Sequence, residues 1–211
     1  MRAILIILLC LIHFFSTAQF TCPCTAGTNK PKQQRSGAKH VTNYDDFVLK
    51  EDTIEVKYMY KWESKFKNKT KTISITPTNP ASKRKSGTPE DTLYILKGFL
   101  WFISQEDNDC DFHIEIGTTD TFATRMIVEV TKENTDLQKK IRDELAARNL
   151  KILDCNTSSP GVAHYDSPLP VIVIGLGFYD KSHKPNTNHG DIHCKKFAWE
   201  LHPVKDIIFL D

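Results

Sequence analysis

The chain has 211 residues, with 28 Lys and Arg against 26 Asp and Glu, a formal net charge of +2. This length suits one domain with an extension and argues against two full domains, since domains usually span about 100–150 residues. The near-neutral total hides an asymmetry, because residues 30–87 carry 14 Lys and Arg against 6 Asp and Glu, whereas residues 88–211 carry 13 against 20. The basic region would attract a polyanion or an anionic surface, but the alternative of a solvated, lysine-rich extension is the interpretation that we favour.

The N-terminus has the features of a cleavable signal peptide. Arg2 provides a positive start, residues 3–15 are mostly apolar, and Ser16, Thr17 and Ala18 are small residues suited to peptidase cleavage. We therefore predict a signal peptide over residues 1–18 and export to the periplasm or the extracellular space. The apolar run is shorter than the about 20 residues that cross a bilayer, so we predict no membrane span.

A basic region follows the predicted signal. Residues 19–40 are rich in Lys, Gln, Gly, Ser and Pro and are predicted to form a flexible tail. Apolar and aromatic residues alternate with polar ones over residues 53–62, which predicts a strand, and residues 70–76 are a plausible partner strand. The sequence thus predicts a basic β-hairpin extension over residues 41–76, followed by a linker over residues 77–90.

The remaining residues, 91–211, are predicted to form a compact domain with five strands and one helix. The expected strands cover residues 92–105, 110–116, 125–131, 171–178 and 197–210. Gly98 in the first strand predicts a bulge or a sharp bend that lets this strand serve two neighbours. Leu137, Ile141 and Leu145 recur every fourth residue and predict a helix over residues 135–149, with Thr135 as its cap and Asn149 as its left-handed stop.

This order of elements resembles an oligonucleotide/oligosaccharide-binding (OB) fold. In such a fold the helix between the third and fourth strands plugs one end of a five-stranded Greek-key barrel. The expected fold class is therefore mainly β with one capping helix, namely an OB-like barrel plus an N-terminal β-strand extension. The segment Trp199-Glu200-Leu201-His202-Pro203-Val204 is also similar to a group of exported bacterial proteins of unassigned function.

One branch of this fold suggests a possible activity. Asp111 and Arg125 have the spacing of an Asp and an Arg in staphylococcal nuclease-like domains, and Thr131 and Glu133 fall where that family has Thr and Glu. The resemblance implies a calcium-dependent phosphodiesterase with Asp111, Arg125 and Glu133 in the site. Val130 replaces the second metal-binding Asp of the family, and a carboxylate fewer weakens a calcium site, which needs several oxygen ligands.

A second candidate site is the histidine-rich segment near the C-terminus, because imidazole is a common ligand of transition metals such as zinc or copper. The alternative role for these histidines is to order a long loop through hydrogen bonds. The candidate metal ligands are His183, His189, His193 and His202.

His113 is a further candidate, as a general base or as a surface residue paired with carboxylates. No complete catalytic set emerges, so the sequence leaves enzymatic activity open. We interpret the protein as a binding or interaction module whose contact surface comprises Asp111, His113, Glu115 and the loop over residues 180–194. The expected partner is a polyanion or an extracellular ligand, and the expected cofactor is a divalent metal, calcium or zinc.

Overall fold

The structure is a computed structural model, and it describes residues 39, 41–70, 84, 86–105, 109–118, 125–153, 164–180 and 198–211. The predicted signal peptide, the tail except for Lys39, and His183, His189 and His193 lie outside these residues. No helix within the described ranges combines the length and the apolar character needed to cross a membrane.

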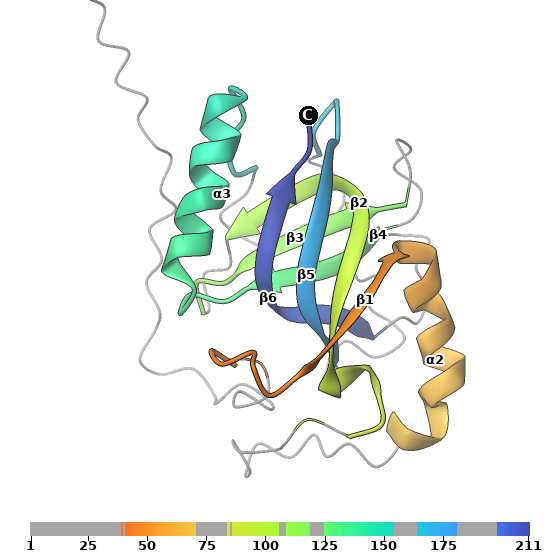
Figure 1. The fold of residues 1–211 in the computed structure, drawn as a ribbon. Coiled ribbons are helices and arrows are strands. Elements are labelled where there is room, and N and C mark those ends of the chain that lie inside the picture. Colours follow the sequence, from red (N-terminus) through yellow and green to blue (C-terminus); the bar gives the residue numbers. More distant parts are fainter. Residues whose placement is uncertain are drawn as a thin grey trace, which may run out of the picture.

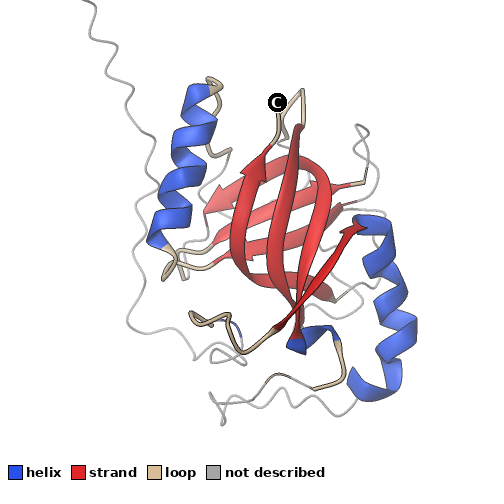
Figure 2. Ribbon diagram, in the orientation of Figure 1, coloured by secondary structure: helices blue, strands red, loops and turns tan. Residues whose placement is uncertain are grey.

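Five strands close into a barrel (Figures 1 and 2). They are β2 (Thr92–Gln105), β3 (Phe112–Gly117), β4 (Arg125–Val130), β5 (Leu169–Tyr179) and β6 (Trp199–Phe209). The strands follow the order β2-β3-β4-β6-β5, and β5 pairs again with β2. Neighbouring barrel strands are antiparallel except β4 and β6, which are parallel. This topology confirms the mainly β fold class and is compatible with an OB-like barrel.

The long strand β2 serves several neighbours, as predicted, but the irregularity is not at Gly98. Residues 93–100 pair with β5 and residues 99–105 with β3, and the register shifts between Leu100 and Phe102. Gly98 has a different role: a Cβ atom there would lie 2.5 Å from the Ile116 side chain and 2.7 Å from the Gly117 carbonyl oxygen. Only glycine therefore allows β3 to approach β2 so closely at the point where their pairing begins.

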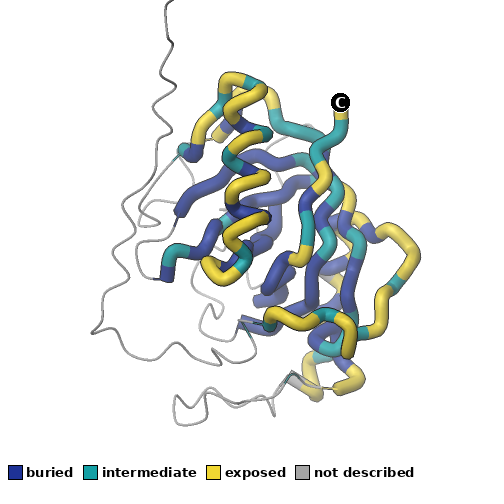
Figure 3. The backbone as a smooth tube through the Cα atoms, turned by 60° about the vertical axis from the view of Figure 1, so that its left-hand side comes forward, coloured by how far each residue is buried: buried dark blue, intermediate teal, exposed yellow. Residues whose placement is uncertain are grey.

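Strand alternation separates two faces of β3, β4 and β6. Ile114, Val128 and Leu201 belong to the apolar cluster inside the barrel. Because successive side chains on a strand point to opposite sides, the residues between them lie on the outer face. Apart from Ile127 on β4, most of these outer residues are polar and nevertheless buried: Asp111, Glu115, Arg125, Glu129, Glu200 and His202. Figure 3 shows how much of the barrel backbone belongs to buried residues.

Helix α3 (Thr135–Ala147) joins β4 to β5 and completes the core. Leu137, Ile141 and Leu145 are buried in the same apolar cluster as the barrel interior, as their spacing predicted. The cap is Asn134 rather than Thr135, since the Asn134 side chain accepts a hydrogen bond from the Leu137 amide. Asn149 has a φ of 56°, so the predicted left-handed stop is confirmed.

The predicted N-terminal β-strand extension is confirmed by one strand, but the predicted strand over residues 53–62 is wrong from Val56 onward, and residues 71–76 of its predicted partner lie outside the described residues. Strand β1 (Val48–Glu55) is followed at once by helix α2 (Val56–Thr70), and β1 pairs with β2 in parallel. The alternation up to Trp62 was misleading because Val56, Met59 and Trp62 also follow helical spacing, and these three side chains are the buried ones. Packing of this helical face against the barrel decided the outcome.

The packed part of the chain begins before residue 91. The short 3-10 helix η1 (Pro89–Asp91) lies within the predicted linker and the start of the predicted domain. Thr88, Pro89 and Glu90 are buried, and the Glu90 carboxylate accepts a hydrogen bond of 3.1 Å from the Tyr179 amide on β5. These contacts tie the end of the predicted linker to the barrel.

Candidate functional site

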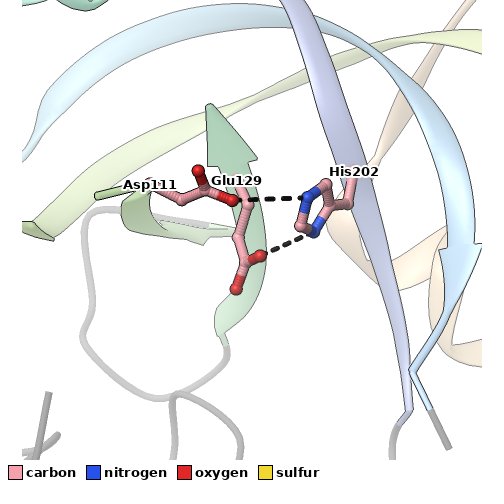
Figure 4. Close-up of side chains that lie close together, drawn as sticks. All are labelled: Asp111, Glu129 and His202. Carbon is pink, nitrogen blue, oxygen red and sulfur yellow. Dashed lines mark ion pairs between the residues drawn. The ribbon is translucent and has the colours of Figure 1, made fainter. Parts of the chain in front are cut away.

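The candidate site is built on the outer face of β3, β4 and β6, around His202. Asp111 immediately precedes β3, Glu129 lies on β4 and His202 lies on β6 (Figure 4). The three residues are 0%, 4% and 0% exposed, respectively. One ligand atom from each residue lies within 4.8 Å of the other two, so this group could hold a metal ion.

Both ring nitrogens of His202 face carboxylates. Nδ1 lies 2.6 Å from Glu129 Oε2 and 3.1 Å from Glu200 Oε1. Nε2 lies 3.8 Å from Asp111 Oδ2, which is longer than a hydrogen bond. Within the described part of the chain, neither Asp111 Oδ2 nor Glu200 Oε2 accepts a hydrogen bond. A buried carboxylate oxygen that accepts no hydrogen bond can coordinate a cation.

Backbone contacts fix the Asp111 side chain at the end of β3. The Lys132 amide donates a hydrogen bond of 2.8 Å to Asp111 Oδ1, which leaves Oδ2 directed at His202. The preceding residue, Cys110, is disulfide-bonded and has a φ of 71°. Its carbonyl accepts a hydrogen bond of 3.0 Å from Gln138 on α3. Asp111 is therefore held in place by two elements, namely the connection from β2 to β3 and helix α3.

Further charged groups surround this trio. His113 Nδ1 lies 3.5 Å from Glu129 Oε1. The Lys39 ammonium, on a side chain that is 12% exposed, forms an ion pair of 3.0 Å with Asp180 and lies 5.4 Å from the centre of the Phe178 ring. Among the described residues, this part of the protein thus gathers more carboxylates than permanently charged cations.

The proton affinities of the site reflect burial and mutual attraction. Burial, followed by the neighbouring Asp109 carboxylate, raises the pKa of Asp111 to about 8. Burial lowers the pKa of His202, but the Glu129 carboxylate outweighs this effect and raises the pKa to about 9. Burial also opposes ionisation of Glu129, yet His202 and Lys39 hold its pKa well below the usual range. At neutral pH a protonated His202 therefore lies between an ionised Glu129 and a neutral Asp111.

The structure brings together some predicted site residues and separates others. Asp111, His113 and His202 lie in one cluster through Glu129. Arg125 is buried in an ion pair with Glu115 between Nε and Oε2. Glu133 lies exposed in the turn after β4. The roles assigned to these residues by resemblance to nuclease-like domains stay predictions.

Sequence reasoning missed Glu129, Glu200 as a partner of His202, and Lys39. A signal for Glu129 was available, because it occupies the outward position of a strand whose inward residues, Val128 and Val130, are apolar. Lys39 had no such signal, since it lies far from β4 and β6 in the sequence.

Comparison with known proteins assigns no family: no protein-family model matches the sequence, and neither a curated protein nor a solved structure matches it. The resemblances to nuclease-like domains and to exported bacterial proteins therefore gain no support from this comparison, and the barrel itself is compatible with an OB-like fold.

Proposed function

We propose that the protein is an exported binding module with an OB-like barrel, and that it binds a divalent transition-metal ion at Asp111, Glu129 and His202. The observation that carries this proposal is the approach of three buried ligand atoms to within 4.8 Å of one another. The three ligands come from three separate chain segments, so they meet only when the barrel is folded. Three protein ligands also leave a coordination position for water or a bound molecule.

The donor set favours an ion such as zinc over calcium. Calcium takes six to eight oxygen ligands, whereas an imidazole nitrogen with two carboxylates suits a transition metal. Glu200 supports this assignment, because metal-bound histidines usually donate their second N–H to a carboxylate. In the metal-bound protein, the Glu129 carboxylate would exchange its contact with Nδ1 for a contact with the ion. The Nδ1–H group would still donate to Glu200, whose carboxylate lies 3.1 Å from Nδ1, and this contact would orient the ring.

Charge balance also supports the proposal. Asp111, Glu129, Asp180 and Glu200 are all buried, and within the described ranges Lys39 forms an ion pair with Asp180. A divalent ion at Asp111 and Glu129 supplies the positive charge that protons on Asp111 and His202 otherwise provide. Metal binding then releases protons, so affinity should increase as the pH rises from 6 to 8.

The test is zinc titration of the mature protein, residues 19–211, prepared without a histidine tag. Calorimetry should give one ion per chain. Asp111→Asn keeps the size of the side chain and removes its charge, so affinity should fall by at least about tenfold. Asp143→Asn on the exposed face of α3 is the matched control and should bind as the unaltered protein does.

Glu200→Gln tests the orienting role. We expect a loss of about 10–100-fold in affinity with one ion still bound at saturation, as for other carboxylates that support a metal-bound histidine. A stoichiometry near zero for the unaltered protein, with zinc, copper, manganese and calcium each tried, would contradict the proposal.

A further inference from the structure

The residue that precedes Asp111 combines two features that bear on the site. Cys110 is disulfide-bonded, and it has a φ of 71°, in the left-handed region that glycine favours. It is the one cysteine in the described ranges, and it is only partly buried. A disulfide at an accessible position can exchange with a small thiol, so the environment of Cys110 is open to redox chemistry.

The backbone conformation of Cys110 is imposed by its contacts. A residue other than glycine stays at positive φ only where the surrounding structure holds it there. The Cys110 carbonyl oxygen accepts hydrogen bonds of 3.0 Å from the Gln138 side chain and 3.4 Å from the Gln105 side chain. The disulfide holds the side chain of the same residue. It is the covalent one of these constraints, and it is also the one that a chemical reaction can remove.

Asp111 follows any change in the backbone of Cys110. A rotation about φ of Cys110 turns the peptide group that links the two residues. Asp111 Oδ1 accepts a hydrogen bond of 2.8 Å from the Lys132 amide, and Oδ2 lies 3.8 Å from His202 Nε2. Because metal–ligand distances tolerate deviations of only about 0.2 Å, a small rotation at Cys110 moves Asp111 out of reach of an ion held by Glu129 and His202.

We propose that the Cys110 disulfide is a redox switch, whose reduction releases Asp111 and weakens binding of a divalent ion. This inference rests on the metal binding proposed above. The reductant is a small thiol, which attacks the disulfide and forms a mixed disulfide with one of its cysteines, and a second thiol then displaces that cysteine. The protein gains two electrons and two protons as a pair of thiols, and the reductant leaves as its own disulfide. In the oxidising compartments that predicted export implies, the bonded form is the resting state.

The first test compares Cys110→Ser with Cys110→Asn, after free thiols in every protein have been blocked by alkylation. Both variants lack the disulfide, but asparagine adopts positive φ more readily than serine. Zinc calorimetry of mature Cys110→Ser should show an affinity about tenfold lower than that of the unaltered protein. Cys110→Asn should stay within about threefold of the unaltered protein, since its backbone can keep the left-handed conformation.

The second test needs no metal, because it follows the amide of Lys132 by hydrogen exchange. This amide should exchange about tenfold faster in Cys110→Ser, since its acceptor on Asp111 is released. The matched control is the Tyr179 amide, which also donates to a carboxylate, that of Glu90. Its exchange should change by less than about twofold, whereas a general loss of stability would accelerate both amides.

The third test reduces the folded, unaltered protein with glutathione and then alkylates it. Mass spectrometry should find the label on Cys110. No label at Cys110, an equal loss of zinc affinity in the two variants, or unchanged exchange of the Lys132 amide would each overturn the switch. Zinc binding that is the same in all three proteins would contradict the switch alone, whereas no zinc binding by the unaltered protein would contradict the proposed function as well.

Discussion

The inner and outer faces of β3, β4 and β6 are both excluded from water, yet they are stabilised in different ways. The inner face is apolar, and Phe112, Ile114 and Val128 are 0% exposed. The outer face carries Glu129, which is 4% exposed, and His202, which is 0% exposed. Apolar burial stabilises in proportion to area, whereas a buried charge is tolerated only when a partner compensates for its lost hydration. The charged side chains of the outer face therefore depend on one another, and removal of one of them leaves its partner without compensation for its lost hydration.

The largest expected effect is from Arg125→Met. This change removes the ion pair between Arg125 and Glu115, a residue that is 1% exposed. We expect the free energy of unfolding to fall by about 3–5 kcal/mol, the usual result of breaking a buried pair on one side. Urea denaturation monitored by tryptophan fluorescence measures this change.

The matched control replaces both partners, as Arg125→Met/Glu115→Leu. Because neither charge of this buried pair remains, the double variant should recover most of the lost stability. A double variant as unstable as Arg125→Met alone would show that the outer face depends on shape at this position and not on charge pairing.

The second effect is a loss of stability as the pH rises. The pKa of His202 is about 9 in the folded protein and about 6.5 when unfolded. Its stabilising contribution is therefore complete below pH 6.5 and is lost as the pH rises through 9. We expect the free energy of unfolding in chelator-treated protein to fall by about 1–3 kcal/mol between pH 6.5 and 9. Stability that rises over this interval would contradict the arrangement around His202.

Asp111 acts in the same direction and can be separated by mutation. Its pKa of about 8 lies above the unfolded value of about 4, so the folded state holds a proton that the unfolded chain has lost, and stability declines from pH 4 to 8. Asp111→Asn cannot ionise. We therefore expect a shallower decline in melting temperature from pH 5 to 8 than in the unaltered protein, and an equal slope in both proteins would disprove the raised pKa.

The smallest effect is expected on the inner face. Ile114→Val removes one buried methylene and should lower the free energy of unfolding by about 0.5–1.5 kcal/mol. The loss should be the same at pH 5 and pH 8, because the apolar cluster that contains Ile114 holds no Asp, Glu or His among the described residues. A loss that varies with pH would mean that the two faces are coupled.

Local patterns predicted most of the barrel. The predicted strand over residues 92–105 has the observed bounds of β2, and the spacing of Leu137, Ile141 and Leu145 located α3. The prediction failed over residues 56–62, where one set of apolar residues fits both strand and helix periods. Such ambiguity is resolved by packing, and here Trp62 packs against Tyr94 and Trp199, which are distant in sequence.

The sequence by itself determined the number of barrel strands, the capping helix and the alternation of apolar and polar residues, because these depend on neighbours along the chain. Only the tertiary structure decided that Asp111, Glu129 and His202 meet, that Glu200 shares the His202 nitrogen, and that Arg125 pairs with Glu115. These contacts depend on the closure of the barrel, in which β6 pairs with β4 although the two strands lie some seventy residues apart in the sequence. No pattern of neighbouring residues encodes a pairing between segments so far apart.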